Sequence, residues 1–246
     1  RKHLVEYDDV MNKHREIMYR RRRTILEKEN IREEMLEMVR NQANLIVMMH
    51  ADLQSHDKWN YKEMAETLSN LHRDSEHRIT EEELKKTDKS DELVQMAEAF
   101  LEKEYDEKEN NIGGTSINNI STSGLVGPEV ETPRGGVREG DTSPSRLVMR
   151  RVERAVALRV IDTLWMQHID ELSKLRERVS LRGYGQRDPL IEYKSEAFEM
   201  FTQLLKEIQQ QTVSTLFKIK MQAKAGVEWV SRDRAMTDAP AMSSKA

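Results

Sequence analysis

The chain has 246 residues, of which 34% are charged, 37% are hydrophobic and only 5% are aromatic. This composition offers little apolar surface for its length, so we do not expect one deeply buried core. Cysteine is absent, which excludes a disulfide framework and every metal site built on thiolates.

The net charge of −4 is unevenly distributed. Residues 51–110 hold nine basic and 18 acidic side chains, whereas residues 146–246 hold 18 basic and 13 acidic ones. An acidic middle and a basic end indicate that different segments face different surroundings, which is not typical of a general polyanion-binding protein. No apolar run reaches the roughly 18 residues that a membrane-spanning helix needs.

Residues 1–41 predict one long helix. Their apolar side chains recur at steps of three and four residues, as one face of a helix requires. They are Leu4, Tyr7, Val10, Met11, His14, Ile17, Met18, Ile25 and Leu26, followed by Ile31, Met35, Met38 and Val39. A helix of about 40 residues is about 60 Å long, so we expect a strut along which other elements lie.

Four consecutive arginines occupy residues 20–23 of this predicted helix. A consecutive run winds around a helix at about 100° per residue and does not form one stripe. The favoured interpretation is solvated arginines paired with Glu16 and Glu27 at helical spacing, and the alternative is phosphate binding. Few aromatic side chains lie nearby to stack on bases, so we expect no nucleic acid partner.

Residues 42–145 predict a small domain of short helices that ends in a flexible insertion. One candidate buried set is Trp59, Tyr61, Met64, Leu68 and Leu71, and another is Leu93, Met96, Ala97, Phe100 and Leu101. Thr80 and Glu83 have the spacing of an N-terminal capping box. Residues 110–145 are rich in Gly, Ser, Thr, Asn and Pro, which predicts a disordered segment.

The strongest helical pattern begins at residue 146. The first apolar stripe consists of Val148, Val152, Val156, Val160, Leu164, Trp165, His168, Ile169, Leu172, Leu175 and Val179. The second consists of Phe198, Phe201, Leu204, Leu205, Ile208, Thr212, Leu216 and Ile219. The short loop between them predicts an antiparallel hairpin about 45 Å long over residues 146–222. Residues 223–246 read as a flexible tail, and the predicted fold class is all-α.

The turn of this hairpin carries the candidate site. Gly183 suits the left-handed conformation that ends many helices. Asp188 is placed to cap the next helix, and Pro189 suits its first position. Tyr184 lies between two glycines and offers either an exposed aromatic contact surface or a ring folded back on its own helix ends. The residues around it are Arg182, Gly183, Gly185, Gln186 and Arg187.

The sequence contains no recognisable catalytic motif. It has neither the Gly-x-x-x-x-Gly-Lys-Ser/Thr phosphate loop nor the Gly-x-Ser-x-Gly nucleophile motif. None of the seven histidines has a glutamate three positions earlier, as a di-metal helical bundle requires. We therefore expect no catalytic residue, no nucleotide-binding residue, no metal and no cofactor in this chain.

Two regions resemble the SecA family of bacterial preprotein translocase motors. Residues 4–16, LVEYDDVMNKHRE, are similar to the family's scaffold-helix signature. Residues 161–165 (IDTLW), 181–189 (LRGYGQRDP), 192–194 (EYK) and 198–201 (FEMF) resemble its two-helix finger. The resemblance covers about half of the chain and keeps these stretches in the family's order.

The resemblance implies four parts. They are a scaffold helix at 1–41, a helical wing domain at 42–145, the two-helix finger at 146–222 and a C-terminal tail at 223–246. In this family the scaffold helix braces the ATPase domains, and the finger enters the channel through which unfolded preproteins pass. By the motif, Tyr184 is the tip residue that contacts the moving polypeptide, and Arg182, Gly183, Gly185, Gln186 and Arg187 shape its loop. A phenolic ring suits this role because it contacts many kinds of side chain.

The implied partners are the SecYEG channel, unfolded preproteins and the motor domains of the same protein. An acidic lipid surface is a further candidate for the basic residues near the finger. The implied location is cytoplasmic and peripheral, at the inner face of the plasma membrane. We expect a fragment that is no enzyme on its own, with ATP and Mg²⁺ used only by the full-length protein. The alternative is a stand-alone helical adaptor or coiled-coil protein that has lost the motor.

Overall fold

The computed structural model describes residues 2–51, 59–72, 77–87, 89–111, 144–182 and 188–219. Within these ranges the chain forms seven helices and no strand, which confirms the predicted all-α class. The helices are α1 (Lys2–Glu27), α2 (Arg32–His50), α3 (Tyr61–Leu71), α4 (Glu81–Leu84), α5 (Ser90–Asn111), α6 (Pro144–Arg182) and α7 (Pro189–Lys218). Most of the predicted insertion at 110–145 and the whole tail at 223–246 lie outside the described residues.

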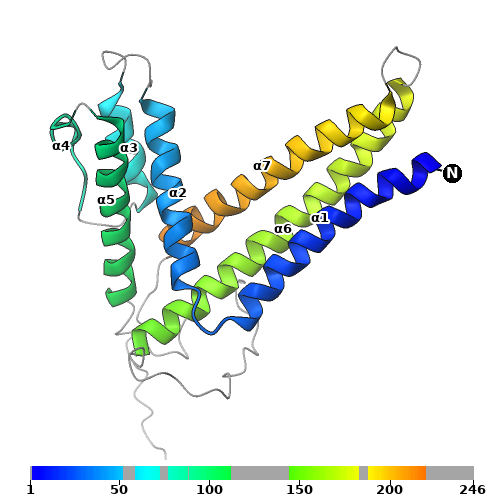
Figure 1. The fold of residues 1–246 in the computed structure, drawn as a ribbon. Helices are drawn as coiled ribbons and strands as arrows, with labels where there is room; N and C mark the ends of the chain where they lie inside the picture. Colours follow the sequence, from blue (N-terminus) through cyan, green and yellow to red (C-terminus); the bar gives the residue numbers. More distant parts are fainter. Residues whose placement is uncertain are drawn as a thin grey trace, which may run out of the picture.

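The helices form two groups (Figure 1). The helices α6 and α7 pack against each other as an antiparallel hairpin, and α1 lies along both of them. The helices α2, α3 and α5 form the second group, with the short α4 beside α3. None of the described helices combines the length and the hydropathy needed to cross a bilayer.

One hydrophobic core joins the two groups. It includes the fully buried Val39, Leu68, Leu101, Val152 and Ile208, which come from five different helices. Both buried sets predicted for the wing region contribute to this core, either as buried or as partly buried side chains. The predicted capping box is also present: Thr80 Oγ1 accepts a hydrogen bond from Glu83 N at 3.3 Å, and the Glu83 carboxylate accepts one from Thr80 N at 2.9 Å.

The single helix predicted over residues 1–41 is wrong in one respect, because α1 ends at Glu27 and α2 begins at Arg32. The Oδ1 atom of Asn30 accepts a hydrogen bond from Arg32 N at 2.9 Å. Such local bonding by an Asn side chain competes with the helical hydrogen bonds of the backbone. The boundary expected at residue 41 therefore falls inside α2, and the turn of the chain lies at residues 28–31.

Arg154 of α6 stabilises the end of α1. Its guanidinium donates hydrogen bonds to the backbone oxygens of Ile25 (3.2 Å), Lys28 (2.6 Å) and Glu29 (3.2 Å). The last carbonyls of a helix have no partner within the helix, so a side chain from a neighbouring helix can satisfy them. A residue more than 120 positions away in the sequence thus helps to fix where α1 stops.

Candidate functional site: a braced helical hairpin

The second arm of the hairpin begins at the two residues that the sequence marked for capping. The Asp188 backbone is extended, and its carboxylate accepts a hydrogen bond from Leu190 N at 2.9 Å. Pro189 occupies the start of α7, where a missing N–H leaves no helical hydrogen bond unmade. These contacts fix the direction in which α7 leaves the turn.

The tip itself lies outside the described residues. This applies to Gly183, Tyr184, Gly185, Gln186 and Arg187. Arg182 is the last residue of α6, and its side chain is also outside the description. The contact of Tyr184 with a polypeptide therefore stays a prediction.

The outer half of the stem has an apolar cluster of its own. Its buried members are Leu172, Leu175 and Val179 of α6 together with Tyr193 and Ala197 of α7. Tyr7, Val10 and Met11 of α1 and Met200 of α7 pack against this cluster. Because Val179 lies one turn before the end of α6, the two arms are packed almost to the tip.

The helix α1 contacts both arms near their outer end. The rings of Tyr7 and Tyr193 meet edge to face, with centroids 4.7 Å apart and planes at 76°. The guanidinium carbon of Arg176 in α6 lies 5.7 Å from the centroid of the Tyr7 ring, and Arg176 also pairs with Asp8 at 3.3 Å. Aromatic edges and cations over ring faces are favourable arrangements. The hairpin is thus braced by a third helix.

Exposed ion pairs link the same three helices. Arg178 of α6 pairs with Glu196 of α7 at 2.8 Å, and Arg22 of α1 pairs with Asp162 of α6 at 3.0 Å. Within α1, Arg20 pairs with Glu16 and Arg23 pairs with Glu27, as helical spacing predicted. Solvent-exposed pairs contribute little free energy, so the apolar cluster and not these pairs holds the arms together.

Two histidines lie buried between α1 and α6. His14 Nδ1 and His168 Nε2 are 3.3 Å apart, and the His14 ring stacks on Phe201 of α7 with centroids 4.1 Å apart. Burial lowers the pKa of His14 to about 4, and burial together with the neighbouring His14 lowers the pKa of His168 to about 4. Both rings are therefore neutral at neutral pH, and one ring N–H can donate to the other ring nitrogen. Both residues belong to the predicted apolar stripes.

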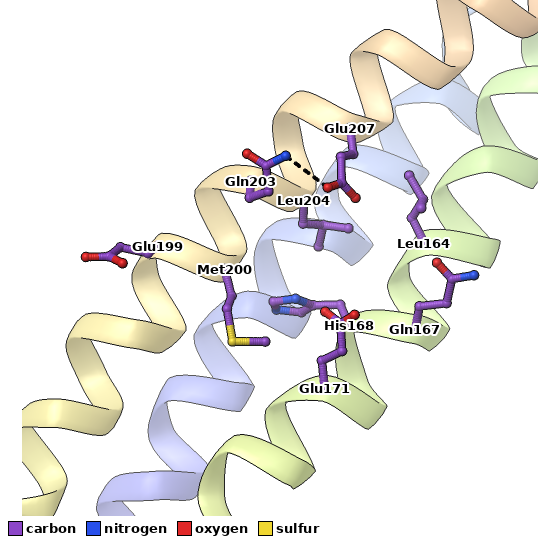
Figure 2. Close-up of a pocket in the computed structure, with 9 residues that line it drawn as sticks. All are labelled: Leu164, Gln167, His168, Glu171, Glu199, Met200, Gln203, Leu204 and Glu207. Carbon is purple, nitrogen blue, oxygen red and sulfur yellow. Dashed lines mark hydrogen bonds between the residues drawn. The ribbon is translucent and has the colours of Figure 1, made fainter. Parts of the chain in front are cut away.

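A cavity of about 400 Å³ opens between α6 and α7 beside this pair (Figure 2). Figure 2 shows His168 reaching from α6 toward α7, where Met200 and Leu204 lie close to it. The lining residues are Leu164, Gln167, His168, Glu171, Glu199, Met200, Gln203, Leu204 and Glu207. Three carboxylates and neither a lysine nor an arginine line the cavity, so its chemistry favours cationic groups over anionic ones. Sequence reasoning missed it because these polar positions read as solvated helix surface.

A buried polar cluster lies at the other end of α6. Arg150 pairs with Glu109 of α5, and its Nη2 is 3.1 Å from a Glu153 oxygen and 3.1 Å from the Tyr105 hydroxyl. The Tyr105 hydroxyl donates to Glu153. Burial raises the pKa of Glu153 to about 7, although Arg150 and Tyr105 act in the opposite direction. This cluster joins α5 to the base of the hairpin.

Comparison with known proteins identifies relatives along nearly the whole chain. The family model described as "SecA Wing and Scaffold domain" matches residues 1–220. The "Protein translocase subunit SecA" of Caldicellulosiruptor saccharolyticus is 34% identical over 217 residues, which are 88% of this chain and 21% of that protein.

Two further relatives have similar identity and coverage. The "Protein translocase subunit SecA" of Pelotomaculum thermopropionicum is 33% identical over 222 residues, covering 90% of this chain and 21% of that protein. The "Protein translocase subunit SecA 1" of Alkaliphilus metalliredigens is 32% identical over 240 residues, covering 94% of this chain and 22% of that protein. The chain spans about a fifth of the length of these curated relatives.

Proposed function

Because this chain belongs to the SecA family, whose wing and scaffold domain it matches over residues 1–220, we propose that it is the part of a preprotein translocase that carries motion to the moving polypeptide. Its partners in this proposal are the SecYEG channel, unfolded preproteins and the nucleotide-binding domains of the same protein. The site of action is the inner face of the plasma membrane, with acidic lipid as a further contact of the basic residues near the finger.

The observation that carries this proposal is the bracing of the hairpin by α1. The ring contact between Tyr7 and Tyr193 and the pairing of Arg176 with Asp8 tie α1 to both arms near their outer end. Closely packed helices move as units because their side chains leave little room for local bending. A displacement of α1 by ATP-driven domains would therefore move the hairpin with it.

The finer part of the proposal gives Tyr184 at the hairpin tip the contact with the preprotein. The packed stem supports it, since Leu175, Val179 and Tyr193 hold the two arms together as far as the last full turn of α6. An aromatic side chain on such a turn can contact varied sequences without selecting one. In this proposal Arg182, at the end of α6, and Gly183, Gly185, Gln186 and Arg187 after it shape the loop that presents the ring.

The test uses this chain within a complete SecA protein and measures ATP-dependent preprotein transport into vesicles that contain SecYEG. Tyr184→Ala should reduce transport strongly, because the contact surface of the ring is lost. Tyr184→Phe keeps the bulk and should retain most of the transport, so it is the matched control. Unchanged transport by the Tyr184→Ala protein would refute the assignment of the tip.

A further inference from the structure

The helix α5 contains a fully buried glutamate whose hydrogen bonding is incomplete. Glu104 is 0% exposed, and its Oε2 lies 2.5 Å from His72 Nδ1. Its other oxygen, Oε1, has no hydrogen-bond partner among the described residues. Burying a carboxylate oxygen without a partner is unfavourable, and such groups in native proteins call for a specific explanation.

Two further ligand-type side chains lie next to this carboxylate. Glu107 follows Glu104 by three positions, so both carboxylates lie on one face of α5. His77, in the segment before α4, places its Nδ1 3.1 Å from Glu107 Oε2. One ligand atom from each of the three residues lies within 4.8 Å of the other two.

We propose that His77, Glu104 and Glu107 form a zinc-binding site in the wing region. Zn²⁺ accepts imidazole nitrogen and carboxylate oxygen at about 2.0–2.2 Å, and a water can fill a fourth position. The presence of an imidazole favours zinc over magnesium and calcium, which prefer oxygen ligands only. This inference is independent of the function proposed above.

The arrangement can close on an ion by side-chain rotation alone. Tetrahedral ligands of zinc are about 3.4 Å apart, so ligand atoms that now lie within 4.8 Å of one another must approach by at most about 1.4 Å. The side chains of His77 and Glu107 are 52% and 31% exposed, which leaves them room to rotate. Glu104 is held by His72, as carboxylate ligands of metals are commonly held by an outer hydrogen bond.

Zinc binding would replace the long contact between Glu107 and Lys103 and would join two parts of the wing region. Glu107 Oε1 lies 3.8 Å from Lys103 Nζ, a distance too long for a hydrogen bond. The segment that carries His77 leads into α4, whereas both glutamates belong to α5. A bound ion would therefore tie the start of α4 to α5 and raise the stability of the region when zinc is present.

The experiment titrates Zn²⁺ into the metal-stripped 246-residue protein by isothermal titration calorimetry and follows the thermal unfolding midpoint with and without Zn²⁺. We expect one equivalent to bind and the midpoint to rise. His77→Ala and Glu107→Gln should each weaken binding at least about tenfold and abolish the rise in midpoint. Both side chains reach the surface, so circular dichroism should show an unchanged helical content.

Two matched variants control for unspecific zinc binding. His50→Gln removes a histidine that also lies near a glutamate, with His50 Nδ1 3.7 Å from Glu63 Oε2. Glu98→Gln removes a carboxylate from the same helix α5. Both should bind zinc like the unmodified protein. The proposal fails if no stoichiometric binding occurs, if binding survives in the His77→Ala/Glu107→Gln double variant, or if His50→Gln abolishes it equally.

Discussion

At the residue scale, the buried histidines give the fold a dependence on pH. The pKa values of His14 and His168 are lowered to about 4 by burial, whereas an unfolded histidine has a pKa of 6.5. The folded state therefore binds fewer protons than the unfolded state between these values, so this contribution to stability is complete above pH 6.5 and is lost as the pH falls toward 4.

The corresponding prediction concerns His168→Gln, which keeps a polar group beside His14 but does not titrate. Between pH 7.5 and pH 5 the unmodified protein should lose up to about 2 kcal/mol of unfolding free energy through this histidine. Urea denaturation at the two pH values measures the loss, which should be smaller in the variant. Equal losses in both proteins would contradict the assignment.

Glu153 gives the stability a pH dependence of the opposite sign to that of the two histidines. Its pKa is raised to about 7, mainly by burial, so the folded state holds a proton that the unfolded state releases near pH 4.5. Its contribution therefore falls as the pH rises from 4.5 through 7. Glu153→Gln should remove this fall, and the variant should gain stability relative to the unmodified protein by up to about 2.5 kcal/mol between pH 5 and pH 7.5. Urea denaturation tests this, and a parallel pH profile of the two proteins would refute it.

The difference in predictability among these residues has a physical cause. His14 and His168 could be placed in the interior from the sequence because they continue apolar stripes of period 3.6. Glu104 and Glu153 read as surface residues, since a charged side chain signals burial only through its partner, and the partners lie on other helices. The expectation of no metal rested on the absence of cysteine and on one local spacing, whereas His77 and the glutamates of α5 are brought together by the fold.

At the scale of elements, helical periodicity predicted the two helices of the hairpin, and the short loop predicted their antiparallel direction. The capping of α7 was predicted from Asp188 and Pro189. It did not predict the break between α1 and α2, because no Gly or Pro occurs at residues 28–31 and the apolar stripe continues through Ile31 and Met35. The break depends on Asn30 and on a guanidinium from α6, and a tertiary contact of this kind leaves no local pattern.

Arg154 should therefore matter more than its exposure suggests. Arg154→Ala removes hydrogen bonds to three backbone oxygens at the end of α1 and should destabilise the protein by about 1–3 kcal/mol. Arg154→Lys should restore part of this loss, because an ammonium group can reach a carbonyl but lacks the planar fork of donors. Arg151→Ala, three positions earlier in α6, is the control for urea denaturation. Equal stability of the Arg154→Ala and Arg151→Ala proteins would contradict the capping role.

At the scale of the whole molecule, the core shared by both groups and the α1 brace make the hairpin part of a larger body. The sequence predicted a hairpin and a strut along which other elements lie, but it could not predict which elements contact the strut. The contact depends on Tyr7 meeting Tyr193, and these residues are 186 positions apart. The role of the tip was predicted from the family resemblance alone. The geometry of the stem shows how the two arms are held together, and it does not test that role.

The brace can be tested without disturbing the tip. Tyr7→Ala removes the edge contact with Tyr193 and the face that receives Arg176, so the outer part of the hairpin should separate from α1 more often. Amide hydrogen exchange should then become faster in residues 190–197, while α2 and α5 keep their protection. Tyr19→Ala, a change to a tyrosine of the same helix that is 58% exposed, should leave the exchange of residues 190–197 unchanged.

In a complete translocase, Tyr7→Ala should reduce preprotein transport although Tyr184 is intact, because motion of α1 would no longer be passed fully to the hairpin. Faster exchange with undiminished transport would show that the contact of α1 with the hairpin is not needed for transport. Unchanged exchange would show that Tyr7 does not brace the hairpin.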